Sequence, residues 1–128
     1  MSDLYLVIEP SGDMRWERIE HDNLLQRLHQ ILDCLTIQTV NTLFDPITLI
    51  VDDAGKLKSP PKEYNEWAWY LYPGWLLSHD DIVGTAVVCA TREDPESPYH
   101  EHDLFGLDFA DYKRLRRFGY RMPPWPKE

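Results

Sequence analysis

Histidine and carboxylate side chains gather at one place in the sequence, the segment His100-Glu101-His102-Asp103. Alternate residues of an extended segment point to the same side, so His100 and His102 could share a metal ion, with Asp103 adding an oxygen ligand. Two histidines with this spacing are a weak signal, because a solvated polar loop contains the same residue types. We therefore predict no metal site and no cofactor, with His100, His102 and Asp103 as weak candidates only.

The residues that serve as nucleophiles in enzymes lack a catalytic context here. Cys89 lies in the most apolar segment of the chain, where a thiol stays protonated and inert. Ser11 and Ser78 lack the surrounding sequence of a nucleophile elbow. The segment 55–59 (GKLKS) resembles part of a phosphate-binding loop, but no glycine stands five residues before Gly55. The sequence therefore predicts a protein that is not an enzyme.

The most informative segment is a block of aromatic residues between positions 64 and 75. Two interpretations are open. The rings could form a satellite core beneath a long loop, with their polar tips in water. They could also form an exposed surface that anchors a protein partner or stacks a nucleobase. The block comprises Tyr64, Trp67, Trp69, Tyr70, Tyr72 and Trp75.

Charge is distributed unevenly along the chain. Residues 1–112 contain 21 acids and 7 bases, whereas residues 113–128 contain 6 bases and 1 acid. Cations in the last turns of a helix are favoured by its unpaired carbonyls, and a cationic handle for phosphate or an acidic partner is the alternative explanation. Together the aromatic and basic segments predict a binding surface formed by Trp67, Trp69, Tyr72, Trp75, Arg114, Arg117 and Arg121.

Length and composition limit the class of protein. A chain of 128 residues predicts one domain, and its formal net charge of −9 argues against a general nucleic-acid binder. No segment has the length of a membrane span or the pattern of a signal peptide, and two cysteines fit a reducing compartment. We expect a cytoplasmic protein that contacts neither nucleic acid nor membrane directly. Its oligomeric state stays open.

The elements that must position these residues follow from apolar spacing. Strands are predicted over residues 3–9, 14–19, 35–42, 47–52 and 82–91, where β-branched and apolar residues dominate. A first helix follows Asp22 or Asn23, and a second extends from a cap at Asp108 to Gly119. Prolines exclude a continuation of the second helix. The first helix faces the core with Leu24, Leu25, Leu28, Ile31 and Leu32.

This order of elements predicts an α+β fold. A mixed or mainly antiparallel sheet of about five strands packs on one amphipathic helix, in a β-grasp-like order, with a peripheral C-terminal helix. Residues 1–91 form the core domain, with an aromatic-rich insertion at about residues 59–79. Residues 92–128 comprise a polar linker, the basic helix and a proline-rich tail.

Two stretches resemble a known family. They are the segment 52–58 (DDAGKLK) followed by Pro60-Pro61, and the segment 81–88 (DIVGTAVV). They resemble a domain-of-unknown-function family that is common in bacteriophages and plasmids of Gram-positive hosts, whose members often open with a strand like residues 6–10. The resemblance implies an origin in a mobile element and a small α+β domain, and it brings no established catalytic residues.

Three functional predictions follow. The first is a non-catalytic accessory protein of a phage or mobile element that binds and inhibits or redirects a host protein, such as a defence component. The second is a binding module that sequesters a small anionic ligand, such as a signalling nucleotide. The third is an acidic protein that imitates DNA. Each would act in the cytoplasm of the host cell, with a host protein as the expected partner.

Overall fold

The computed structural model describes residues 2–58, 62–72 and 81–126. The α+β fold is confirmed. The strands and α-helices are β1 (Leu4–Ile8), β2 (Met14–Arg18), α1 (Leu24–Leu32), β3 (Ile37–Asn41), β4 (Ile47–Asp52), α2 (Glu66–Trp69), β5 (Ala86–Glu93), β6 (His102–Phe105) and α4 (Phe109–Phe118). Two short 3-10 turns, η1 (His21–Asn23) and η2 (Gly55–Leu57), precede α1 and follow β4. None of the helices within these ranges is long and apolar enough to cross a membrane.

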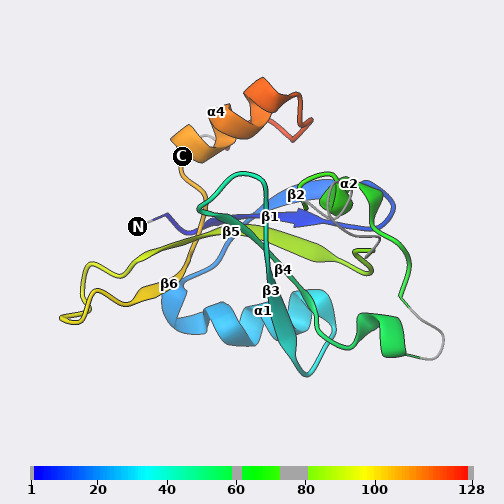
Figure 1. Ribbon diagram of the computed structural model, residues 1–128, viewed down its shortest axis with the longest axis horizontal. Helices are drawn as coiled ribbons and strands as arrows, with labels where there is room; N and C mark the ends of the chain where they lie inside the picture. The colour runs from blue at the N-terminus through cyan, green and yellow to red at the C-terminus, as the bar shows by residue number, and fades with distance from the viewer. Residues whose placement is uncertain (1, 59–61, 73–80, 127–128) are drawn as a thin grey trace.

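The six strands form one sheet in which all described pairings are antiparallel. Five strands follow the order β2-β1-β5-β4-β3 (Figure 1). Strand β6 extends the side of β5 that also holds β1, because Ala90 pairs with Phe105 on that side and with Ile47 of β4 on the other. The chain order is the predicted β-grasp-like order, but β1 and β5 are antiparallel, whereas a β-grasp sheet has a parallel central pair.

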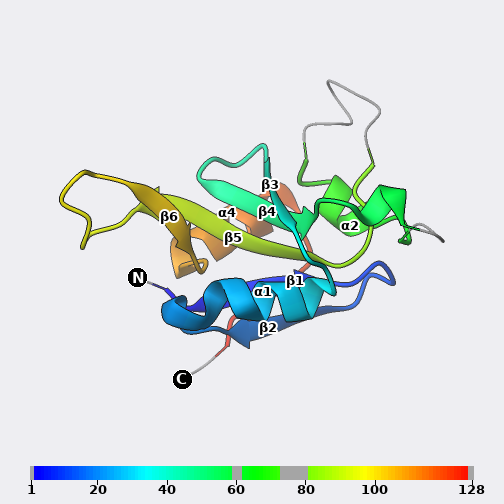
Figure 2. The ribbon, with the colours of Figure 1, turned by 90° about the horizontal axis from the view of Figure 1, so that it is seen from below.

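Both faces of the sheet are covered. Helix α1 lies on one face, and α2 and α4 lie on the other (Figures 1 and 2). Every residue of β1 and β4 is buried, as are the first five residues of β5. Strands with two covered faces require apolar side chains on both sides, which explains the uninterrupted apolar sequences.

Helix α1 packs on the sheet through Leu24, Leu28 and Leu32, which are spaced by four residues and form one stripe. The prediction that Leu25 also faces the core is wrong, because its side chain is 60% exposed. The helix needs only the narrow stripe, since the sheet beneath it supplies Tyr5 and other apolar side chains.

Helix α4 begins and ends where predicted. Asp108 and Asp111 form a reciprocal capping box at its start, and Gly119 ends it with a φ of 100°. Its position is less peripheral than expected, because Leu115 and the following Tyr120 belong to the buried cluster on this face of the sheet. The apolar sheet face would otherwise be exposed to water, which is the physical reason for the difference.

The prediction of a polar linker over residues 92–103 is wrong in part. Strand β5 continues to Glu93, and β6 returns beside it with Glu93 opposite His102. Three of the four residues of β6 are exposed or half-buried, so the apolar pattern that identifies a strand is missing there.

Candidate binding surface

The aromatic block is divided between the core and the surface. Ala68 and Leu71 are fully buried, and the rings of Trp69 and Tyr72 pack against the same apolar cluster. Trp67 and Tyr70 are 36% and 43% exposed, and Tyr64 is also exposed. Part of the block therefore belongs to the core, and part of it is exposed on the surface. Trp75 lies outside the described residues.

Within the aromatic block, Trp67 contacts the segment that follows α4. The hydroxyl of Tyr120 donates a hydrogen bond to the Trp67 carbonyl over 2.5 Å, and the two rings meet edge to face at 6.2 Å. On its other side, Trp67 lies against the turn between β1 and β2, where a side chain on Gly12 would come within 2.9 Å of the indole nitrogen. The residues after α4 thus contact α2.

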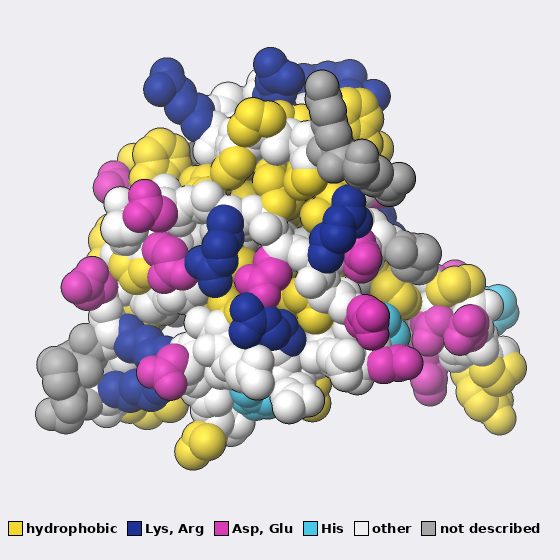
Figure 3. Space-filling view, turned by 180° about the vertical axis from the view of Figure 1, so that it is seen from behind, with side chains coloured by type: hydrophobic (Ala, Val, Ile, Leu, Met, Phe, Trp, Pro, Cys, Tyr) yellow, Lys and Arg dark blue, Asp and Glu magenta, His cyan; other side chains and the backbone are white. Residues whose placement is uncertain are grey.

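The basic side chains gather on α4. Figure 3 shows Lys and Arg side chains concentrated at the end of the molecule that α4 forms. Arg114 points toward the loop before β4, where it donates to the carbonyls of Phe44 and Asp45 and lies 5.5 Å from the Phe44 ring centre. Arg117 is exposed. Arg121, which follows the helix, is also exposed and borders a shallow pocket of about 480 Å³ with Arg116, Tyr112 and Tyr120.

The fold separates the other predicted members of the surface. Tyr72 lines a different groove, beside β3, whose charged lining residues are Asp52, Asp53 and Asp81. Arg114 is engaged with the loop before β4. Tyr72 therefore lies in a groove lined with aspartates, apart from the predicted arginines.

Sequence analysis missed a second aromatic cluster. The indole N–H of Trp16 donates to the Pro123 carbonyl over 3.0 Å, and the Trp16 and Trp125 rings meet at 5.2 Å. Tyr112 and Phe109 of α4 also contact Trp125. The tail therefore runs back along α4 and β2. The available signal was Trp125 itself, a large apolar residue among prolines.

The candidate metal ligands point to separate partners. His100 pairs with the carboxylate of Glu93, and Asp103 lies 3.1 Å from His21 Nε2. His102 lies in β6 opposite Glu93. Within the described ranges, no group of three or more His, Cys, Asp or Glu side chains is placed to hold a metal ion.

Two buried polar residues hold the scaffold together. Asp52, in the DDAGKLK segment, forms ion pairs with Lys58 Nζ at 2.7 Å and with Lys62 Nζ at 3.0 Å, and Lys62 also donates to the carbonyl of Leu32 at the end of α1. Burial alone would raise the pKa of the Asp52 carboxyl, but hydrogen bonds from the two lysines and a backbone N–H lower it below its usual value. These contacts join the DDAGKLK segment, through Lys62, to the end of α1.

Asn65 is the second of these residues. Its side chain is fully buried, and its Nδ2 donates to the carbonyls of Ile8 and Gly84 at 2.9 and 2.8 Å. Its Oδ1 accepts from the Ala68 N–H and caps α2. One side chain thereby fixes α2 to β1 and to the turn before β5.

Neither thiol has the character of a nucleophile. Burial raises the pKa of Cys89 to about 12. Burial and the neighbouring Asp52 also raise the pKa of Cys34, although Lys62 and Lys58 oppose this shift. Both thiols are therefore protonated at neutral pH, which is the less reactive form.

Comparison with known proteins identifies the family. The family described as "Domain of unknown function (DUF3846)" matches residues 1–104, a range that contains β1 to β5 and most of β6 but not α4. None of the curated proteins and none of the solved structures matches the chain. Since the matched range covers most of the 128 residues, the chain belongs to the DUF3846 family.

Proposed function

We propose that this protein is a non-catalytic accessory protein of a phage or other mobile element, which binds and inhibits or redirects a host protein such as a defence component. The contact is made by the α2–α4 surface, defined by Trp67, Tyr70, Arg116, Arg117, Phe118 and Arg121. The observation that carries the proposal is the hydrogen bond from Tyr120 to the Trp67 carbonyl, since it joins the exposed rings of α2 to the cations of α4.

The contacts between the two helices support one continuous surface. The Phe118 ring of α4 meets the ring of Phe44 at 4.8 Å, and the adjacent Leu43 N–H donates to the carbonyl of Leu71, just after α2. Exposed aromatic rings are typical anchors of protein interfaces because they bury a large area at low entropic cost. Phe118 is 52% exposed and extends the apolar part of the surface beyond α2.

The charges support an acidic partner. Arg15, Arg18, Arg27 and Arg92 all pair with carboxylates. In contrast, within the described parts of the chain no acidic side chain pairs with Lys113, Arg116 or Arg117 of α4 or with Arg121 after it. Unpaired cations on a protein of net charge −9 create a local positive field that would steer an acidic surface toward α4.

Native mass spectrometry of the protein isolated from a lysate of a Gram-positive host tests the proposal. We expect a host polypeptide at fixed stoichiometry with the wild type and loss of most of it with Arg117→Gln or Trp67→Ala. Gln26→Glu is the matched control, because it makes the same change in charge on an exposed position of α1, on the opposite face of the sheet. Equal capture by all variants would contradict the proposal.

A small anionic ligand is the second candidate, favoured by the pocket that Arg116 and Arg121 share with two tyrosines. In this case the mass spectrum would show an added mass of nucleotide size instead of a polypeptide. Arg121→Gln would remove the added mass and Trp67→Ala would leave it, because Trp67 does not line the pocket.

A further inference from the structure

The two edges of the sheet differ in how they are protected. Edge strand β2 carries the charged residues Arg15, Glu17 and Arg18, and its Trp16 is hydrogen-bonded to the C-terminal tail. Charges and covering segments are the usual means by which proteins prevent another chain from pairing with a sheet edge. Within residues 2–58, 62–72 and 81–126, edge strand β3 has neither: its exposed residues are the uncharged Gln38, Thr39 and Asn41, and no other segment hydrogen-bonds to its outer edge.

The register of β3 shows which backbone groups face outward. The Thr36 carbonyl accepts from the Asp53 N–H over 3.1 Å, and hydrogen-bonded pairs alternate along an antiparallel ladder. Gln38 and Val40 therefore turn their backbone groups toward β4, whereas Ile37, Thr39 and Asn41 turn theirs outward. Among the described residues, no backbone partner meets these outward groups. Strand β3 thus offers three successive hydrogen-bonding positions to an added strand.

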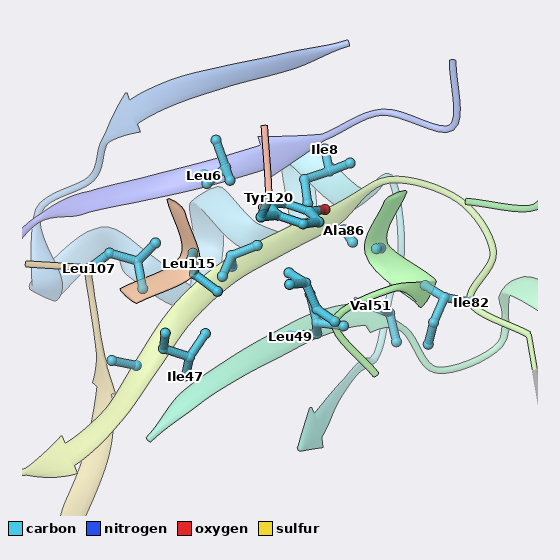
Figure 4. Close-up of a cluster of buried hydrophobic side chains, with 14 residues drawn as sticks. Leu6, Ile8, Ile47, Leu49, Val51, Ile82, Ala86, Leu107, Leu115 and Tyr120 are labelled. Carbon is cyan, nitrogen blue, oxygen red and sulfur yellow. The ribbon is translucent and has the colours of Figure 1, made fainter. Parts of the chain in front are cut away.

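A groove of about 540 Å³ with both polar and apolar walls runs beside this edge. Its walls include Val40 of β3 and Tyr72, together with Val51 and Ile82, which lie at one end of the buried cluster (Figure 4). Leu57, from the DDAGKLK segment, also lines the groove, and 86% of its surface is exposed. The apolar core therefore reaches the surface next to an open strand edge.

The charge of the groove specifies the chemistry of its occupant. Asp53 and Asp81 are exposed in the groove, and among the side chains that the structure describes no Lys, Arg or His lines it. The remaining acid, Asp52, is already paired with two lysines. A second copy paired through β3 would bring like charges together, whereas a basic segment would be complementary.

We propose that β3 and this groove form a second binding site, which accepts an extended segment with alternating apolar and basic side chains as an added antiparallel strand. Successive side chains of a strand point to opposite sides, so the basic set enters the groove while the apolar set faces away from it and the backbone pairs with Thr39. The aliphatic stems of the basic side chains lie along Val40, and their charged ends reach Asp53 and Asp81. The site lies apart from the α2–α4 surface and does not depend on the function proposed for that surface.

The test is an NMR titration of the full chain with a capped six-residue peptide of alternating lysine and valine. We expect shifts and slowed hydrogen exchange at the amides of Ile37, Thr39 and Asn41. The same peptide with glutamate in place of lysine, and the lysine peptide with every amide N-methylated, should not produce them. The N-methylated probe removes the strand hydrogen bonds without altering the protein, so its result is independent of any folding defect.

Two double variants separate specific binding from general attraction to an acidic protein. Asp53→Asn with Asp81→Asn should weaken binding of the lysine peptide about fivefold, as expected for two exposed charge pairs. Glu96→Gln with Glu101→Gln removes the same number of exposed charges elsewhere and should leave binding unchanged. Equal effects of the two variants, or equal binding of the N-methylated peptide, would overturn the proposal. A dimer in sedimentation velocity that Thr39→Pro dissociates would also overturn it, in favour of a second copy.

Discussion

Asn65 shows how one buried polar side chain can connect separate elements. Its amide donates to the carbonyls of Ile8 and Gly84 and accepts from one N–H of α2. A buried backbone group that loses its partner costs more than the hydrogen bond contributes when it is made. Asn65 therefore stabilises the position of the aromatic block rather than contacting a ligand.

Replacing Asn65 by Ala should lower the free energy of unfolding by about 2–4 kcal/mol, because two carbonyls and one N–H lose their partner. Urea denaturation at neutral pH measures the change. Asn23→Ala is the control, since Asn23 also precedes a helix but makes no capping hydrogen bond with its side chain, and it should cost less than about 0.5 kcal/mol. Similar costs for the two variants would contradict the role assigned to Asn65.

Asp52 should make stability depend on pH. Its pKa is lowered in the folded state, so its ionised form stabilises the fold above the usual carboxyl pKa, and this contribution is lost as pH falls through the lowered value. Asp52→Asn should therefore cost about 1–2 kcal/mol at pH 7 and progressively less in acid. Urea unfolding of the wild type and of the variant, from pH 7 down into acid, measures the difference in the free energy of unfolding. A difference that does not change with pH would contradict the ion-pair assignment, and Asp53→Asn, at an exposed neighbour, is the control.

The roles of these two residues could not be predicted from the sequence. Asp52 stands in a segment that predicts a turn, and Asn65 stands among aromatic residues. The partners of Asn65 lie 57 and 19 residues away, so only the tertiary structure brings them together. Local sequence patterns report on neighbours within a turn of helix or a hairpin, and contain no signal for such contacts.

At the scale of elements, the boundaries that depend on local chemistry were predictable. The leucine spacing of α1 and the Asp108 and Gly119 caps of α4 are confirmed. Strand β6 was not predictable, because it is identified by pairing with β5 and not by its own polar sequence. The turn at Gly12 was predictable as a hairpin, but its close contact with Trp67 was not.

The end of α4 gives a test of backbone strain without side-chain crowding. Gly119 has a φ of 100°, and a Cβ placed there meets nothing within 4 Å. Gly119→Ala should therefore cost about 1 kcal/mol from the left-handed conformation alone, and Gly119→Asn should cost less, because Asn tolerates this region. Thermal or urea unfolding of the two variants measures the difference. If Ala were no worse than Asn, the helix would end differently from the structure described.

At the scale of the whole molecule, the sequence indicated that the sheet is buried. It did not indicate which helix covers which face of the sheet. The sequence signal of the two covered faces is the uninterrupted apolar segment in β5. Which helix covers which face depends on long-range packing, and for this reason the predicted binding residues were only partly brought together. Trp67 meets the segment after α4, whereas Tyr72 lies in the groove beside β3.

The central position of β5 has a consequence for synthesis of the chain. On the ribosome, the hairpins β1–β2 and β3–β4 emerge first, each with a mostly apolar strand facing a gap that only β5 can fill. Residues 86–93 join them, and α4 covers the sheet still later. The nascent protein therefore exposes two apolar strand edges until three-quarters of the polypeptide has been made, and its native sheet forms in a single late step.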